Sequence, residues 1–405
     1  RLALVWWADS AQIYINGSKE GEGDLFDFSQ RVLLTESVNP GDEFTVALRL
    51  VSPGHDNGAL VGSKCVYETV GNQDNNIYPG FVASELAIVQ RYCQAFAPDE
   101  LDMIADLVKE ISEQINRRVA EDAEEEKKLH ESLMSVSNHI NKSKIQNLKS
   151  KIQLVGHAHL DMAWLWSVSE TWEAAKNTFA SVLKLQEDFP ELIFCHSTPA
   201  LYAWVEENCP DLFAQIKKAV KNNLWEIVGA FWVEPELNII SGESIVRQLL
   251  YGQRYVKEKF GEFSTVAWLP DSFGFCWTLP QFMVSAGVEY FVTQKLIWND
   301  TTDFPHGTFW WRSPDGSEIF SLMSAPIGEG IDPVKMVEYA IAWEKQTGLK
   351  NYLRLPGVGD HGGGPTRDML EIARRWQDSP LCPEFEFTTV EKYLEEIKEE
   401  GTKGQ

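Results

Sequence analysis

The chain has 405 residues, enough for about two or three domains, and its 44% hydrophobic content is ordinary for a protein with a large core. Its 36 basic and 60 acidic residues give a net charge of −24. This charge excludes nucleic acid and anionic membrane surfaces as partners, because both require a positive face. The sequence has no apolar run of roughly 18 residues and so predicts no membrane span.

Tryptophan, cysteine and the chain ends add further expectations. Most of the 15 tryptophans belong in a core, although flat aromatic rings also pack on the C–H faces of sugars. The six cysteines are scattered without a Cys-x-x-Cys pair, which predicts reduced thiols in a cytoplasmic protein. The chain starts directly in strand-like alternation and stops in a charged helix, so we expect a fragment of a longer protein.

Residues 1–75 are predicted to form a partial, jelly-roll-like β-sandwich. Short β-branched and aromatic runs alternate here with Asn-Gly, Gly-Glu-Gly and Pro-Gly turns, and the runs are ALVWWA, AQIYING, LTESV and EFTVALRLVSP. Roughly four or five strands are too few for a complete sandwich, which usually has seven or more.

Residues 76–148 are predicted to be a helical connector. The segment PDELDMIADLVKEISEQINRRV has apolar residues at the three-and-four spacing of one helix face, and Pro98 and Asp99 supply its start. The acidic run EDAEEEKKLHE that follows is predicted to be a solvated helical face without a function of its own.

Residues 149–385 are predicted to form an α/β sheet or barrel, and residues 386–405 begin a following helical region. Short apolar runs alternate with amphipathic helical stretches, and each run leads directly into polar or glycine residues; the runs are KIQLVG, WEIVGAF, STVAWLP, YFVTQKLIW and NYLRLPGVG. Parallel strands whose carboxyl ends all carry such residues predict one site along that edge.

The segment GHAHLD offers the first candidate ligands. His159 and Asp161 are two residues apart, so on extended backbone an imidazole nitrogen and a carboxylate oxygen project to the same side and can share a cation. His157 projects to that side as well, and parity cannot decide between the two histidines. The alternative is a buried histidine hydrogen-bonded to a neighbouring carboxylate.

Other strand ends add further acids. Glu234 and Glu236 follow one strand, and a buried strand should not end in two carboxylates unless they are solvated, paired or bound to a cation. Asp360 and His361 precede three glycines, which let backbone approach a ligand closely, so either can be a metal ligand. Further acids follow other strands, namely Asp271, Asp300, Asp303, Glu329 and Asp332.

Five motifs in this order resemble the catalytic domain of family 38 α-mannosidases, most closely the cytosolic and bacterial branch: GHAHLDMAWLW, WVEPELNIISGESIVRQLLYGQRY, WLPDSFGFCWTLPQ, TQKLIWN and GDHGGGPT. The likeness runs from about Lys151 to Leu370. It implies a catalytic α/β barrel of the glycoside hydrolase and deacetylase type. It also implies a retaining enzyme that removes terminal α-D-mannosyl residues from oligosaccharides with one divalent ion, zinc in the first place and cobalt as the alternative.

The resemblance also implies roles for individual residues. His159, Asp161 and Glu236 match metal ligands, and His157 would support them without binding the metal. His361 matches the last ligand, unless a one-residue shift gives that role to Asp360. Glu236 is also the implied nucleophile, and Glu329 is the implied acid/base, which we expect a less polar setting to keep protonated. The implied substrate-binding residues are Trp164, Arg247, Asp271, Lys295, Trp298 and Asn299.

Two departures from the family pattern affect these roles. The family usually has aspartate at both catalytic positions, where this chain has Glu236 and Glu329. Glutamate is one methylene longer, and the two carboxyl groups of a retaining pair lie only about 5 Å apart. The family's large C-terminal β region, which completes the substrate cleft, is absent from this sequence.

Two other classes of function stay open, and so does a homo-oligomeric state. A metal-dependent carbohydrate deacetylase on a related barrel uses the same His/Asp ligands but attacks with metal-bound water. A non-catalytic sugar-binding fragment would explain the tryptophans but not the acids at the strand ends.

Overall fold

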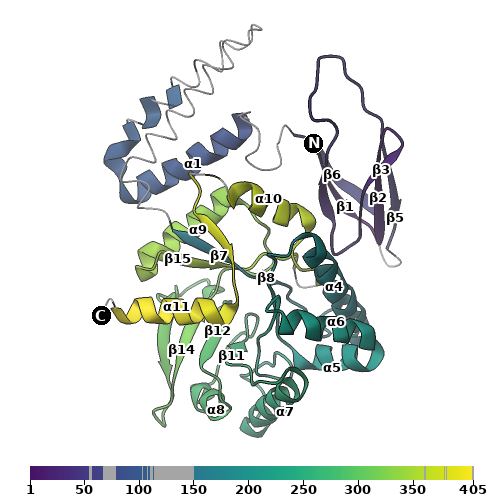
Figure 1. The fold of residues 1–405 in the computed structure, drawn as a ribbon. Helices are drawn as coiled ribbons and strands as arrows, with labels where there is room; N and C mark the ends of the chain where they lie inside the picture. Colours follow the sequence, from purple (N-terminus) through teal and green to yellow (C-terminus); the bar gives the residue numbers. More distant parts are fainter. Residues whose placement is uncertain are drawn as a thin grey trace.

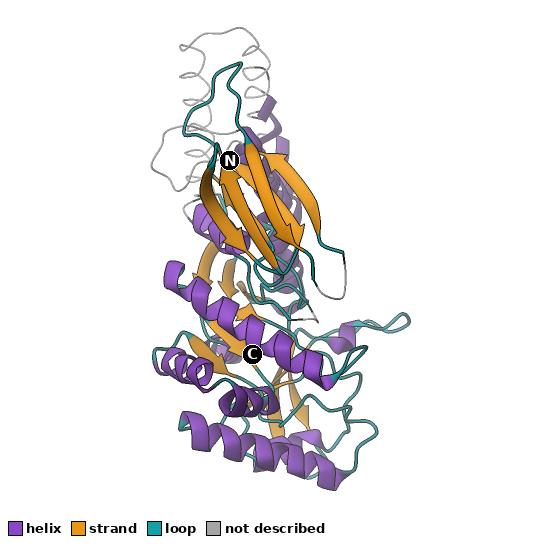
Figure 2. Ribbon diagram, turned by 90° about the vertical axis from the view of Figure 1, so that its right-hand side faces the viewer, coloured by secondary structure: helices purple, strands orange, loops and turns teal. Residues whose placement is uncertain are grey.

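A computed structural model describes residues 1–53, 57–66, 79–102, 104–106, 108–109, 113, 150–359, 362–377, 379 and 381–403. A β-rich amino-terminal unit lies beside a larger unit of mixed strands and helices (Figure 1). Seen from the side, the β unit lies at one end of the molecule (Figure 2). The acidic run and most of the predicted connector lie outside the described residues.

The β unit consists of two three-stranded antiparallel sheets, in the orders β4-β1-β6 and β3-β2-β5. Its strands are β1 (Leu2–Trp7), β2 (Ser10–Ile15), β3 (Ser18–Gly23), β4 (Ser29–Val32), β5 (Val46–Val51) and β6 (Ala59–Cys65). Alternate residues of β1 and β2 are buried in one apolar cluster that includes Leu4, Trp6 and Ile13.

Several details of this unit differ from the prediction, and β4 and β6 lie outside the four predicted runs. The run LTESV, residues 34–38, is irregular rather than a strand. The polar segment SKEGEG, whose Gly-Glu-Gly was predicted to be a turn, instead forms the strand β3 as the partner of β2. Asn16 and Gly17 make the turn between them with φ of 49° and 88°, conformations that asparagine and glycine tolerate. An exposed strand at a sheet edge needs no apolar pattern.

The described part of the connector is helical, as predicted. It comprises α1 (Pro79–Phe96), the 3₁₀ turn η1 (Pro98–Glu100) and the described positions between 101 and 113. Ile88 and Tyr92 of α1 are buried in the main core of the larger unit. The Tyr92 hydroxyl accepts a hydrogen bond from the backbone N–H of Ser150, 3.1 Å away, so α1 is attached where the next strand begins.

In the larger unit strands and helices alternate. The strands are β7 (Lys151–Leu154), β8 (Gly156–His157), β9 (Phe194–His196), β10 (Trp225–Ile227), β11 (Val266–Trp268), β12 (Tyr290–Thr293), β13 (Thr308–Arg312), β14 (Glu318–Met323), β15 (Asn351–Arg354) and β16 (Glu384–Phe387). The helices are α4 (Val168–Asp188), α5 (Pro199–Asn208), α6 (Pro210–Lys221), α7 (Gly242–Phe260), α8 (Leu279–Ser285), η3 (Lys295–Ile297), α9 (Pro333–Thr347), α10 (Arg367–Gln377) and α11 (Val390–Lys403).

Three small sheets make up this unit: β15-β7-β16, β10-β9-β8 and β11-β12-β14-β13, parallel except for β13. A hydrogen bond of 2.8 Å from Gly229 N–H to Val266 O connects the second sheet to the third. An isolated parallel β-bridge pairs Glu329, which follows β14 of the third sheet, with Pro356, which follows β15 of the first. The α/β class is confirmed, and all five predicted apolar runs contain strands. The sheets are small and open, so a closed barrel is not shown.

The β unit is attached to the segment that follows the glycine run. The hydroxyl groups of Ser29 and Thr366 are 3.1 Å apart, and the Asp27 carboxylate accepts the backbone N–H of Arg367 at 2.8 Å. Arg31 pairs with Asp368 in the first turn of α10. The amino-terminal unit therefore anchors the carboxyl side of GGGPT.

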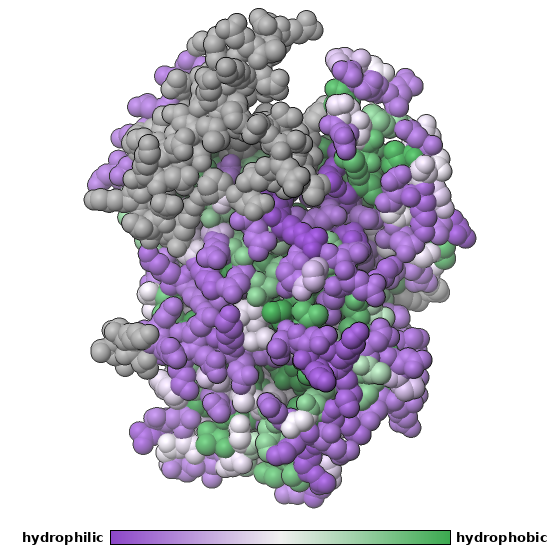
Figure 3. Space-filling view, in the orientation of Figure 1, coloured by the Kyte–Doolittle hydropathy of each residue, from purple (hydrophilic) through white to green (hydrophobic). Residues whose placement is uncertain are grey.

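The surface agrees with the composition. The face shown in Figure 3 is mostly hydrophilic, with small hydrophobic areas between the charged side chains. Among the described residues no helix combines the length and apolar character that a membrane crossing requires.

A buried carboxyl group holds the last helix against β10. Glu226 accepts the backbone N–H groups of Val390 and Glu391, at 2.6 and 2.9 Å, where α11 begins. Burial raises the pKa of Glu226 from 4.5 to about 7, against these two hydrogen bonds. The folded protein therefore retains a proton that the unfolded chain loses between these pH values.

This pKa shift predicts that Glu226 makes the free energy of unfolding fall as the pH rises from about 4.5 to about 7. In Glu226→Gln the acceptor oxygen remains but the titration is gone, so this part of the pH dependence should disappear. Urea denaturation of both proteins at several pH values measures it. Parallel pH profiles of the two proteins would contradict the prediction.

Candidate active site

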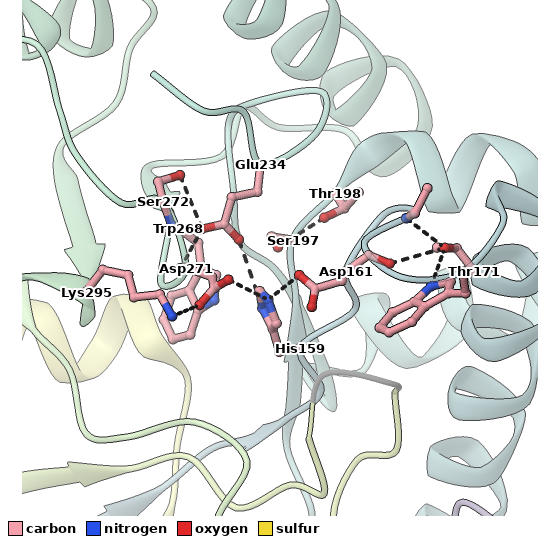
Figure 4. Close-up of polar contacts among 12 residues, drawn as sticks. His159, Asp161, Thr171, Ser197, Thr198, Glu234, Trp268, Asp271, Ser272 and Lys295 are labelled. Atoms are coloured by element: carbon pink, nitrogen blue, oxygen red, sulfur yellow. Dashed lines mark hydrogen bonds and ion pairs between the residues drawn. The ribbon is translucent and has the colours of Figure 1, made fainter. Parts of the chain in front are cut away.

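The motif GHAHLD places two predicted ligands side by side. The chain leaves β8 at His157, and His159 follows with its ring buried at the carboxyl end of the strand. Its Nε2 lies 3.2 Å from Oδ1 of Asp161 (Figure 4). The backbone carbonyl of Asp161 accepts the Thr171 hydroxyl at 3.1 Å, so the start of α4 supports this loop.

The structure distinguishes the two histidines that parity left equivalent. His157 is buried, and its Nε2 accepts a hydrogen bond of 3.1 Å from the indole N–H of Trp268. Burial, with the charges of His159 and His196, lowers the pKa of His157 well below 6.5. His157 is thus a neutral core residue whose Nε2 is occupied, which leaves His159 to face the carboxylates.

A second strand end brings Asp271 to the same place. Asp271 follows β11, and its Oδ2 lies 3.9 Å from Nε2 of His159. Its Oδ1 pairs with the buried ammonium group of Lys295, which follows β12. The Lys295 ammonium also lies 3.6 Å from the ring centre of Trp298 and 4.4 Å from that of Phe273, in cation–π contact with both.

A third carboxylate, Glu234, approaches from the loop after β10. Its Oε1 accepts the backbone N–H groups of Asp271 and Ser272 at 2.6 and 2.8 Å, and its Oε2 lies 4.0 Å from Nδ1 of His159. Burial raises the pKa of Glu234 from 4.5 to about 7, although the charge of His159 and the two backbone hydrogen bonds oppose the shift. Figure 4 shows Glu234 between His159 and the Asp271 loop.

Three acids thus surround one imidazole. Burial alone would favour the neutral ring, but the hydrogen bond that His159 donates to Asp161 and the charges of Glu234, Asp161 and Asp271 outweigh it and raise the pKa of His159. These carboxylates create a field that favours a positive charge at the imidazole, whether the charge is a proton or a metal ion that replaces it.

His159, Asp161 and Asp271 fit a divalent ion. One donor atom from each lies within 4.8 Å of the others. Zinc ligands at about 2.0–2.2 Å in a tetrahedron lie about 3.3 Å from one another, close to the 3.2 Å between His159 and Asp161. Nitrogen together with carboxylate oxygen is a donor set that zinc and cobalt accept. Asp271 was expected to bind sugar, whereas the structure places it among these donors.

A further predicted ligand, Glu236, is not part of this group of donors. Glu236 is half-buried, and its Oε1 accepts the backbone N–H of Asn238 at 3.1 Å. Asp360 and His361 lie outside the described residues, so both stay predictions. The glycines that follow are closely packed, since a Cβ at Gly362 would contact the Thr178 hydroxyl and Leu160.

The predicted acid/base residue, Glu329, lies among cations rather than in the less polar setting that we expected. Its Oε2 accepts from Nη2 of the buried Arg354 at 2.5 Å, and its Oε1 lies 3.1 Å from Nζ of Lys335. Burial opposes ionisation, but the hydrogen bonds and charges of Arg354 and Lys335 outweigh it and lower the pKa of Glu329. The carboxylate and base form is therefore favoured over the acid form.

The predicted substrate-binding residues fall into three places. Asp271, Lys295 and Trp298 lie together, and Trp298, 66% exposed, lines an open pocket with Ile297, Asn299 and Asp300. Trp164 is 60% exposed and contacts Trp166 edge to face. Arg247 lies on the exposed side of α7, where it pairs with Glu243 at 2.8 Å.

Sequence reasoning noted Glu234 but gave it no role, and it missed Ser272 and Arg354. Glu234 carried a usable signal, because a second acid after a buried strand needs a partner. Arg354 had one too: an arginine inside the apolar run NYLRLPGVG requires a buried anion, and Glu329 supplies it. No sequence signal would have indicated Ser272, whose contribution is mainly a backbone N–H.

Comparisons with known proteins agree with these motifs. The family described as "Glycosyl hydrolases family 38 N-terminal domain" matches residues 149–404. Alpha-mannosidase G of Dictyostelium discoideum is 35% identical over 257 residues, 63% of this chain and 24% of that protein. The alpha-mannosidase of Saccharomyces cerevisiae is 34% identical over 261 residues, 62% of this chain and 24% of that protein.

A solved structure is similar as well. The alpha-mannosidase from Enterococcus faecalis V583 superposes with a TM-score of 0.51 at 25% sequence identity, covering 62% of this chain and 30% of that one. The chain thus spans about a quarter of the length of the curated relatives that it matches.

Proposed function

The chain belongs to glycosyl hydrolase family 38, and from this membership and the geometry of the site we propose that it is the catalytic part of a retaining α-mannosidase. The proposed substrates are oligosaccharides with terminal α-D-mannosyl residues, and the proposed cofactor is one divalent ion, zinc before cobalt. The mannosidase relatives, each about 35% identical, support the reaction class.

The observation that carries the proposal is the meeting of His159, Asp161 and Asp271 at the carboxyl ends of β8 and β11. Asp271 lies more than 100 positions after His159 and Asp161 in the sequence, yet the donor atoms of all three share one small space. The hydrogen bonds between neighbouring sheets also support a barrel-like arrangement around this edge.

In this proposal His159 and Asp161 hold the ion together with Asp271, and Glu236 and one of Asp360 and His361 remain predicted ligands. A bound divalent ion would supply Lewis-acid contact to neighbouring sugar hydroxyls and favour the oxocarbenium-like transition state. Lys295 holds the other oxygen of Asp271 and so limits its rotation. Trp298 and Trp164 offer exposed aromatic faces to the sugar ring.

Glu236 is the proposed nucleophile and Glu329 the proposed acid/base. In the second half of a retaining reaction the acid/base residue must take a proton from water, and the ionised state that Arg354 and Lys335 favour suits this step. In the first half it must be protonated to assist the leaving group, a state that the lowered pKa restricts to acidic pH.

Replacement of Glu329 by alanine should reduce hydrolysis of a natural mannoside by about 10²–10⁴-fold, the usual contribution of general acid catalysis. An activated aryl mannoside needs little protonation of its leaving group and should lose far less. Parallel measurement of kcat/KM for both substrates checks this. Equal losses on the two substrates would remove Glu329 from the acid role and leave it as the partner of Arg354.

A 2-deoxy-2-fluoro or 5-fluoro mannosyl fluoride separates the proposal from its rivals. A retaining mannosidase with Glu236 as nucleophile accumulates a covalent adduct, which peptide mass spectrometry would locate on Glu236. A deacetylase attacks with water and forms no adduct, and a sugar-binding fragment binds mannosides without turnover. An adduct on another carboxylate would keep the retaining mechanism and correct the nucleophile.

The proposed cellular compartment is the cytoplasm, and the proposed partner is a glycan. None of the six cysteines, all of them described, forms a disulfide, which supports the reducing environment of the cytoplasm. The net charge of −24 supports a neutral glycan rather than a nucleic acid as partner. A homo-oligomeric state stays open.

A further inference from the structure

We propose that Glu234 is a positioning residue that orients two of the metal-site groups at once, the imidazole of His159 and the loop that carries Asp271. This inference rests on the proposed function, because it concerns how the residues of a divalent-metal site are held. It assigns Glu234 a role distinct from that of Glu236, the proposed nucleophile two residues further along the chain.

One oxygen of Glu234 fixes the Asp271 loop. Oε1 accepts hydrogen bonds from two consecutive backbone N–H groups, those of Asp271 at 2.6 Å and Ser272 at 2.8 Å. The Ser272 hydroxyl also donates to the carbonyl of Pro235 at 3.0 Å, so the Asp271 loop is bonded to the backbone of the Glu234 loop as well as to the Glu234 side chain. Hydrogen bonds from N–H groups to a carboxylate are short and strong, and here they determine where the Asp271 carboxylate can lie.

The other oxygen of Glu234 faces His159. Oε2 lies 4.0 Å from Nδ1, while Nε2 on the opposite side of the ring lies near Asp161 and Asp271. At 4.0 Å the contact is electrostatic rather than a hydrogen bond, and it favours the ring form with its proton on Nδ1. That tautomer leaves the lone pair of Nε2 directed at the metal-site carboxylates, as a ligating histidine requires.

The surroundings of Glu234 permit little adjustment. Its side chain is only 17% exposed, and the side chain of Asn238 leaves no room for a Cβ at Gly274, so the loops that carry Glu234 and Asp271 interlock. Glu236, by contrast, accepts a hydrogen bond from Asn238 within its own loop and makes no described hydrogen bond to the Asp271 loop. Among the described contacts of the two acids, those of Glu234 reach both the Asp271 loop, by hydrogen bonds, and His159, by the electrostatic contact at 4.0 Å.

Two variants separate the two contacts. Glu234→Gln retains an acceptor for the N–H groups of Asp271 and Ser272 but loses the negative charge beside Nδ1, whereas Glu234→Ala loses both. Glu226→Gln is a matched control, because Glu226 is also an enclosed carboxylate that accepts two consecutive backbone N–H groups, but it holds α11 rather than the site.

Zinc titrated into metal-free protein gives the affinity by calorimetry, and the visible absorption of the cobalt-loaded protein reports the ligand geometry. Loss of a residue that orients a ligand typically costs 10–100-fold in metal affinity. We expect a loss of about 10-fold with an altered cobalt spectrum for Glu234→Gln, about 100-fold for Glu234→Ala, and no change for Glu226→Gln. The thermal midpoint of each metal-free protein shows whether the variant is folded.

The outcomes separate this inference from the proposed function. Unchanged zinc affinity in both Glu234 variants would overturn the positioning role and leave the metal site intact. Equal losses in Glu234→Gln and Glu226→Gln would also overturn it, because the effect would then be general destabilisation. No zinc binding by the unaltered protein would overturn the proposed metal site and this inference with it.

Discussion

Asp161→Asn is expected to lower kcat/KM for an aryl α-mannoside by roughly 10²–10³-fold, the range typical for loss of one preorganised electrostatic group. Asparagine has nearly the shape of aspartate and can still bond Nε2 of His159, 3.2 Å away in the structure, so the fold should persist. It lacks the negative charge that holds a cation. The expected result is therefore loss of turnover and of bound metal together.

Steady-state kinetics with Asp161→Asn and with a control, Asp211→Asn, measure this effect. Asp211 is an exposed acid in the first turn of α6, and its change to asparagine removes the same charge away from the site. Full activity in Asp211→Asn with loss in Asp161→Asn assigns the effect to the site. An Asp161→Asn protein with unchanged kcat/KM would mean that this carboxylate holds no catalytic cation.

Gly357→Ala is expected to lower the free energy of unfolding by about 3 kcal/mol or more, at the upper end of overpacking effects. A Cβ at this position would lie far inside the contact distance of the His157 carbonyl oxygen. That oxygen belongs to backbone where β8 passes the end of β15, since His157 N–H donates to Pro356 O at 3.0 Å. Relief of the clash would require the two strands to separate beside the site.

Gly359→Ala supplies the control for this prediction. Within the described part of the chain, a Cβ at Gly359 would meet no atom within 4 Å beyond its chain neighbours, and no left-handed backbone conformation makes glycine necessary there. Urea denaturation should therefore give the unaltered stability for Gly359→Ala and a marked loss for Gly357→Ala. Equal stability of the two variants would mean that the strand ends move apart at little cost.

Much of the fold could be predicted because the apolar runs are short and clearly delimited. Each of the five runs from KIQLVG to NYLRLPGVG contains a strand. The start of α4 is also visible in the sequence, because Ser167 and Glu170 have the three-residue spacing of a capping box. Among the strands of the larger unit, β9, β13, β14 and β16 were not predicted. β9 has only three residues, β14 and β16 lack a distinctive polar ending, and β13 pairs antiparallel to β14, so their identity depends on pairing with neighbours.

The site could be predicted only in part. Spacing indicated His159 and Asp161, but it could not separate His157 from His159, because the Trp268 indole that occupies His157 lies 111 positions away. The closeness of Asp271 and Glu234 to His159 depends on which strands are neighbours, which periodicity does not determine. The setting of Glu329 was predicted wrongly, because Arg354 of β15, whose charge favours the ionised carboxylate, comes beside Glu329 only when the chain folds.

The metal content of the purified protein shows whether His159, Asp161 and Asp271 hold a divalent ion. Elemental mass spectrometry should find one tightly held zinc or cobalt ion per chain in the unaltered protein and none in His159→Ala, whose fold is checked by circular dichroism. This result would show that HAHLD forms a metal site. No metal in the unaltered protein, even after incubation with zinc, would contradict the account and leave His159 as a buried, protonated partner of Asp161.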